Sequence, residues 1–94
     1  MTKKEYIIKL IDKLSESWDF AKWLKVFMKN KELDQKTLDF LFDFLSSNLN
    51  SFTENNKNKL IKNSLNIISK LKKEEKNEIS KDLEKELDNL INDL

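Results

Sequence analysis

Acidic and basic side chains are the main groups in this chain that could do chemistry. The 94 residues include no cysteine, histidine, glycine or proline. Without cysteine or histidine, the common nucleophile–base pairs and the usual zinc sites cannot form. Without glycine, the phosphate-binding loops lack the residue that their tight turns require. We therefore expect a protein that is not an enzyme and that has no cofactor and no catalytic or metal-binding residues.

Two carboxylates come nearest to a metal-binding pattern. Asp39 and Asp43 stand four residues apart, which places both on one face of a helix. Such a pair could hold a hard cation through its oxygen atoms. A pair alone is not specific, and the same strip is where a bundle helix meets water. We interpret the two aspartates as solvated side chains.

The charge of the chain changes sign in its C-terminal part. Residues 57–73 contain six lysines and no acid, whereas residues 74–94 contain eight acids and three lysines. At helical spacing, one face of the predicted fourth helix carries Lys59, Lys62, Asn66, Lys70 and Lys73. This lysine face could follow a nucleic-acid backbone or an acidic protein surface. The acids of residues 74–94 could instead fold back and neutralise it.

Nucleic acid is the less favoured partner of the lysine face. The net charge of the whole chain is only +1, and all of its cations are lysines. Arginine is the side chain that suits two-point recognition of phosphates and bases. We also expect no exposed aromatic side chains beside the lysine face on which bases could stack.

The elements that position these groups are predicted to be helices. Apolar residues recur at three- and four-residue spacing, and no glycine or proline interrupts them. We expect one domain, residues 1–94, folded as a compact all-α antiparallel bundle of four or five short helices. The predicted ranges are about 3–14, 17–30, 35–49, a helix that begins after Ser51 or Thr53 and ends near 71, and 75–92.

Capping residues support several of these helix starts. Thr2 with Glu5 fits a capping box, and Ser17 and Asp34 are predicted N-caps. The start of the last helix is less sharply marked, because the sequence KLKKEEKNEI contains no strong helix breaker. The fourth and fifth helices could therefore be continuous.

The bulkiest side chains gather in the predicted second and third helices. The stretch SWDFAKWLKVFMK, residues 17–29, holds both tryptophans. The apolar arcs of the two helices are broad, which predicts burial against two neighbours each and a central place in the bundle. Their rings are accordingly assigned to the core, among them Phe20, Trp23, Phe27, Phe40, Phe42 and Phe44.

Two features of the sequence leave alternatives open. Trp18 falls on the lysine side of the second helix, so it is either a hydrophobic staple at the helix entry or an exposed anchor for a partner. The fifth helix has a narrow apolar seam that includes Leu83, Leu87 and Ile91. The seam either docks on its own bundle or exchanges with a second copy, as a homodimer, or with another partner.

Elimination then leaves a small non-enzymatic protein-interaction module, such as an adaptor, an inhibitor or an immunity-type protein. Its predicted partner is another protein, which binds near Trp18 or on the lysine face. The alternative is a nucleic-acid-associated helical protein that uses the lysine face. We expect a cytoplasmic chain that does not enter a membrane, because no long apolar run is present and no cysteine occurs. The richness in lysine, asparagine and isoleucine indicates an AT-rich genome.

Overall fold

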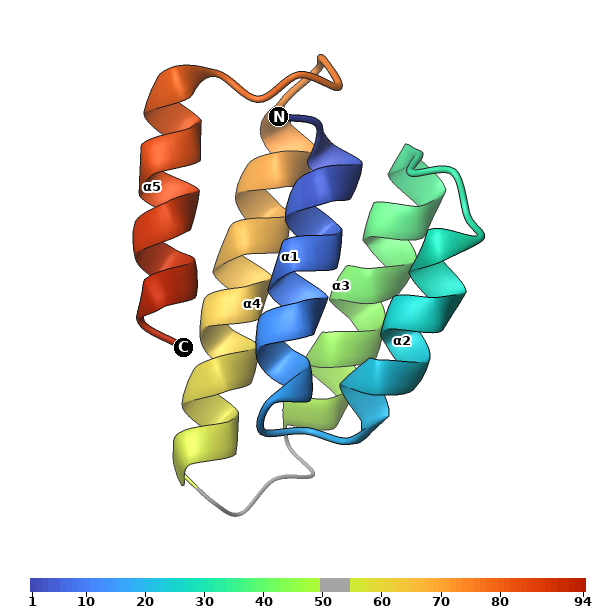
Figure 1. The fold of residues 1–94 in the computed structure, drawn as a ribbon, viewed down its shortest axis with the longest axis vertical. Coiled ribbons are helices and arrows are strands. Elements are labelled where there is room, and N and C mark those ends of the chain that lie inside the picture. The colour runs from blue at the N-terminus through green and yellow to red at the C-terminus, as the bar shows by residue number, and fades with distance from the viewer. Residues whose placement is uncertain (50–54) are drawn as a thin grey trace.

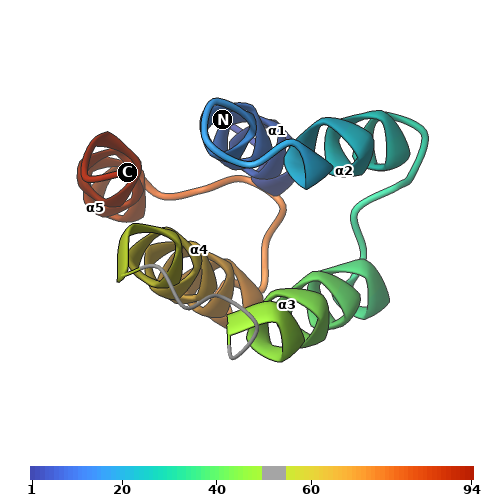
Figure 2. The ribbon, with the colours of Figure 1, turned by 90° about the horizontal axis from the view of Figure 1, so that it is seen from below.

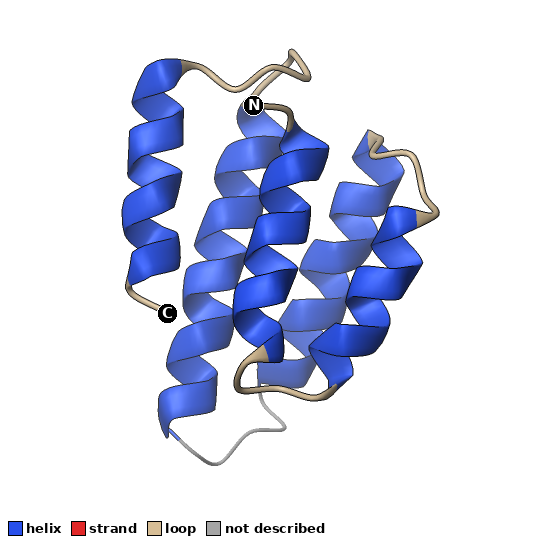
Figure 3. Cartoon of the chain, viewed as in Figure 1, coloured by secondary structure: helices blue, strands red, loops and turns tan. Residues whose placement is uncertain are grey.

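The protein is an all-α bundle in a computed structural model, which describes residues 1–49 and 55–94. These residues form five helices joined by loops (Figures 1 and 3). Along the chain the helices are α1 (Lys3–Ser15), α2 (Phe20–Lys29), α3 (Gln35–Leu49), α4 (Asn55–Lys73) and α5 (Lys81–Asn92). Consecutive helices run in opposite directions (Figure 1), so the predicted all-α antiparallel bundle is confirmed.

Local hydrogen bonds account for most of the helix starts. The Thr2 hydroxyl accepts from the Glu5 amide at 3.2 Å, and Asp34 Oδ1 accepts from the Thr37 amide at 2.8 Å. Both predicted caps are confirmed. Ser17 is not a cap, because its amide bonds to the Leu14 carbonyl and prolongs the last turn of α1. The predicted caps Ser51 and Thr53 lie outside the described residues.

The link between α4 and α5 is a non-helical loop, so the predicted start of the last helix near residue 75 is wrong. Residues 77–79 lie against the N-terminal residues instead. The Lys3 amide donates to the Asn77 carbonyl at 2.9 Å, and the Ile79 amide donates to the Met1 carbonyl at 3.0 Å. Ser80 then caps α5 by accepting from the Leu83 amide at 3.3 Å. These tertiary contacts replace the helical hydrogen bonds of this segment.

The helices form two layers and one covered edge (Figure 2). α1 and α2 make one layer, α3 and α4 make the other, and α5 lies beside α1 and α4. The close backbone contacts join α1 to α2, α3 to α4, α4 to α5 and α1 to α4. The predicted central pair, the second and third helices, is therefore wrong. α1 and α4 are central, and α2 and α3 form the edge opposite α5.

The core follows from this arrangement. Side chains from all five helices are buried, and those of α1 and α4 are among the least exposed, with Tyr6, Ile7, Ile67 and Leu71 at 0%. On α2 the buried side chains are Ala21, Leu24 and Met28, and on α5 they are Leu83, Leu87 and Ile91. The apolar seam of α5 thus docks on its own chain. Exchange of α5 between two copies stays a prediction.

A substitution pair within α2 tests this assignment of the core. Leu24 is 1% exposed, whereas Val26, two residues away, is 62% exposed. Leu24→Ala should lower the free energy of unfolding by about 2–5 kcal/mol, because it opens a cavity. Val26→Ala should change it by less than about 0.5 kcal/mol. Urea denaturation followed by circular dichroism measures both. Equal costs would show that α2 does not pack as described.

Candidate interaction surface

Most of the lysine face is exposed to solvent, and one of its lysines contacts α5. Lys59, Lys62, Asn66 and Lys73 are exposed on the outer side of α4. Lys70 is half-buried and forms an ion pair with Glu86 of α5. One cation of the face is therefore neutralised within the chain, which is the fold-back arrangement that the charge pattern suggested.

Trp18 lies in the turn before α2, because the helix begins at Phe20 and not near Ser17. The side chain is half-buried and packs against the core. Its ring stacks on Phe20 at 5.6 Å and on Phe44 of α3 at 6.4 Å between ring centroids. Trp18 therefore joins a larger set of aromatic side chains instead of acting alone.

This aromatic cluster spans the gap between α2 and α3 and consists of Trp18, Phe20, Trp23, Phe27, Phe40 and Phe44. Neighbouring rings are in contact throughout. Within α2, Trp23 lies 5.3 Å from Phe20 and 5.4 Å from Phe27. Between the helices, Phe27 lies 5.9 Å from Phe40, and Phe20 lies 5.2 Å from Phe44. The contacts of these rings are a main link between α2 and α3.

Much of the aromatic cluster is in contact with solvent. Trp23 is 54% exposed, Phe40 45% and Phe20 41%, and the neighbouring Val26 is 62% exposed. The assignment of Phe20, Trp23 and Phe40 to the core is therefore wrong, and Phe27, Phe42 and Phe44 are only half-buried. Contiguous exposed apolar surface of this kind is typical of interaction sites, whereas single exposed apolar residues are ordinary.

The reason for the wrong assignment is geometric. Broad apolar arcs show that a helix has more than one apolar side, but they do not show what covers each side. On α2 the small and aliphatic Ala21, Leu24 and Met28 face the core, and the rings Trp23 and Phe27 lie on one flank of that arc. This one-sided placement of the rings is the signal in the sequence that could have shown an open edge.

Asp39 and Asp43, the two candidate cation ligands on α3, differ in their surroundings. Asp39 forms an ion pair with Lys72 of α4 at 2.7 Å, and Asp43 is exposed. Within the described residues, no group of three or more acidic side chains is arranged to hold a metal ion. Asp39 therefore joins α3 to α4, and Asp43 is part of the solvent-facing rim of α3.

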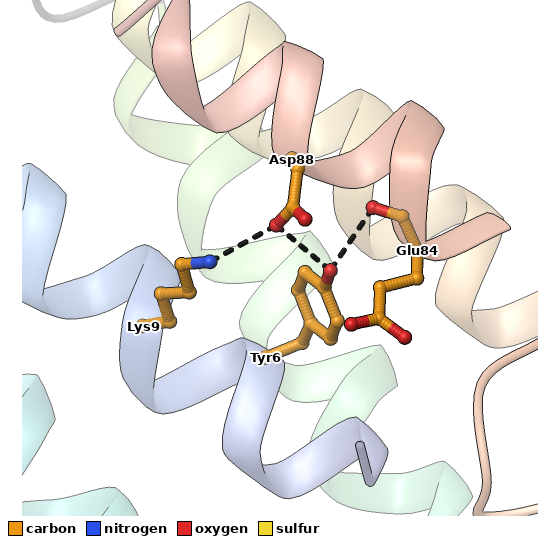
Figure 4. Close-up of polar contacts among 4 residues, drawn as sticks. All are labelled: Tyr6, Lys9, Glu84 and Asp88. Atoms are coloured by element: carbon orange, nitrogen blue, oxygen red, sulfur yellow. Dashed lines mark hydrogen bonds and ion pairs between the residues drawn. The ribbon is translucent and has the colours of Figure 1, made fainter. Parts of the chain in front are cut away.

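A polar cluster on the other side of the bundle connects α1 with α5 (Figure 4). The Tyr6 hydroxyl donates toward two acceptors of α5, Asp88 Oδ1 at 2.8 Å and the Glu84 carbonyl oxygen at 3.0 Å. The Lys9 ammonium donates to the same Asp88 oxygen at 2.9 Å. These contacts link the two helices and hold α5 in place.

The ionisation of this cluster follows from its contacts. Burial, together with the hydrogen bond to Asp88, raises the pKa of Tyr6 well above its usual value. The hydrogen bonds from Lys9 and then from Tyr6 lower the pKa of Asp88. The lowered pKa of Asp88 gives a stabilisation that is present when the pH is above the unfolded value of about 3.9. This stabilisation is lost as the pH falls below that value. The raised pKa of Tyr6 gives a stabilisation that is fully present up to about pH 10. This stabilisation is lost as the pH rises further.

Tyr6→Phe tests the contribution of the hydroxyl. We expect the substitution to cost about 0.5–1.5 kcal/mol of unfolding free energy at neutral pH, the usual net value of a hydrogen bond. The difference from wild type should shrink between about pH 10 and pH 11, because only the unfolded wild-type chain then releases the Tyr6 proton. Urea denaturation at several pH values measures the difference, and a constant difference would contradict the linkage.

Comparison with known proteins adds no relative. No family model, curated protein or solved structure matches the chain. Among the described helices, none is long and apolar enough to cross a membrane. The function is therefore inferred from the surface of the chain itself.

Proposed function

We propose that the protein is a non-enzymatic protein-interaction module that binds another polypeptide through the α2/α3 edge. The observation that carries this proposal is the exposed aromatic cluster, in which Trp23 is the most exposed ring. Trp23 contacts both Phe20 and Phe27 and is still 54% exposed. Tryptophan is enriched among the side chains that dominate the energy of protein interfaces.

The shape of the edge favours a protein over a small ligand. The rings form an extended row along two antiparallel helices, and the hollow beside Phe27 and Phe40 is open to solvent. A small molecule needs a concave site that covers most of its surface. A second helix laid along the row can cover several rings at once, in the way that amphipathic helices bind apolar grooves.

The rings are also held in place before binding. Each ring of the cluster contacts at least one other ring, and Trp18 and Phe27 also pack against the core. Binding therefore requires little ordering of these side chains, and the loss of side-chain entropy at an interface is reduced. Replacement of a central anchor of this kind commonly costs about 2 kcal/mol or more of binding free energy.

The lysine face supports a second candidate function, binding to nucleic acid. Lys59, Lys62 and Lys73 are exposed together on α4, and the part of the chain that the structure describes gives them no ion pair. The pairing of Lys70 with Glu86 weakens this candidate. So does the position of the exposed rings at the α2/α3 edge, on other helices than the lysine face.

Site-specific photo-crosslinking tests the leading proposal. A benzophenone amino acid at position 23 should yield a covalent adduct with a protein in the cells that express the chain. The same amino acid in place of Lys85, which is exposed on α5, is the matched control and should yield none. Phe40→Ala in the chain with the probe at position 23 should weaken the adduct. Equal adducts at both positions, or none at position 23 in a folded chain, would refute the proposal.

Salt-dependent binding tests the second candidate. We expect little binding of labelled single- or double-stranded DNA or RNA at physiological salt, measured by fluorescence anisotropy. A nucleic-acid-binding protein would lose affinity steeply with salt, because each phosphate contact releases counterions. It would lose further affinity when Lys59, Lys62, Lys70 and Lys73 are changed to glutamine. Tight binding with both properties would place this function above the first.

A further inference from the structure

We propose that the occupant of the α2/α3 edge is a second copy of this chain, related to the first by a two-fold axis that crosses the helices. This inference rests on the proposed function and names its partner. In such a dimer α2 lies against α2 and α3 against α3, each pair antiparallel. The contact is isologous, so every interaction occurs twice.

The arrangement of the bundle leaves this edge open. α5 covers the edge formed by α1 and α4 and buries Leu83, Leu87 and Ile91 there (Figure 2). Among the described residues, no sixth helix covers α2 and α3 on the opposite side. If two chains joined through these rings, each chain would cover the α2/α3 edge of the other, as α5 covers the edge formed by α1 and α4.

The charges along the edge are complementary to those of a second copy that lies in the opposite orientation. Because α2 and α3 are antiparallel, the end of α2 and the first turn of α3 meet at one end of the aromatic cluster, where the exposed Lys31 lies over the Phe27 ring and Lys36 is exposed on α3. At the other end of the aromatic cluster the exposed acids are Asp19, just before α2, and Asp43, which precedes Phe44 on α3. An antiparallel second copy brings the lysine end of one chain to the aspartate end of the other.

The remaining charges do not cancel this pattern. The lysine end also holds the acids Glu32 and Asp34, whereas Lys29 lies on the side of α2 that carries Lys25, away from the rings. Asp34 is engaged as the cap of α3. The aspartate end also holds Lys22, which lies 3.7 Å from Asp19, so it has two acids and one lysine.

Overall charge gives the same preference. The chain has a net charge of +1, so two copies meet without appreciable repulsion. A uniformly acidic or uniformly basic partner would place like charges against one end of the edge, which opposes binding. A partner with opposite charges at its two ends would suit the edge. A second copy has such charges, because its edge is identical.

Charge reversal tests the geometry of the dimer. Sedimentation velocity should show a mass near twice the 11.2 kDa of one chain at high concentration, with dissociation on dilution. Lys36→Asp or Asp43→Lys alone should raise the dissociation constant about tenfold, because two attractive pairs become repulsive. The double variant Lys36→Asp with Asp43→Lys should recover most of the affinity, because the reversed charges again face each other.

Controls separate the dimer from other outcomes. Lys62→Asp, on the lysine face, should leave dimerisation unchanged, and Trp23→Ala should abolish it while the circular dichroism spectrum stays helical. A dimer that resists Trp23→Ala, or a double variant no better than the single ones, would overturn the inference. A monomer at all concentrations also overturns it. The proposed function survives if position 23 of that monomer crosslinks to a different protein, and falls with the inference if it crosslinks to none.

Discussion

Burial of α1 and α4 against each other and against the outer helices is the interaction on which the rest of the structure depends. Tyr6 and Ile7 of α1 and Ile67 and Leu71 of α4 have no exposed surface. α2 takes its place by packing on α1, whereas α3 and α5 take theirs by packing on α4. The hydrophobic stabilisation is concentrated on the two central helices, because there a large aliphatic or aromatic side chain is removed completely from water.

The two edges of this central pair are closed by different means. At one edge α5 contributes aliphatic side chains, the Tyr6–Asp88 hydrogen bond and the Lys70–Glu86 ion pair. At the other edge aromatic rings reach across from α2 to α3, and their outer sides stay in water. The first edge is complete within the chain, whereas the second retains apolar surface that a partner can bury. The proposed function follows from this difference between the edges.

Most ionisable groups with described contacts serve to hold the elements together. Asp39 with Lys72 joins α3 to α4, Asp12 with Lys25 joins α1 to α2, and the Lys3 ammonium donates to the Glu74 carbonyl where α4 ends. Charges with such partners contribute orientation more than net stability, because exposed ion pairs are each worth only about 0–1 kcal/mol. At the ends of the aromatic cluster, Lys36 and Asp43 are exposed and have no ion pair within the described residues, so their charges are available to the proposed partner.

The sequence by itself determined the helices, because helical periodicity and caps such as Thr2 and Asp34 depend on residues a few positions apart. It also determined the apolar seam of α5. Only the tertiary structure decided that residues 77–79 pair with the N-terminal residues and that α1 and α4 are central. The sequence predicts only part of the candidate site. Its pattern singles out Trp18, but it assigns Trp23 and Phe40 to the core. A helical pattern gives the direction of an apolar side, whereas the element that covers it comes from a distant part of the chain.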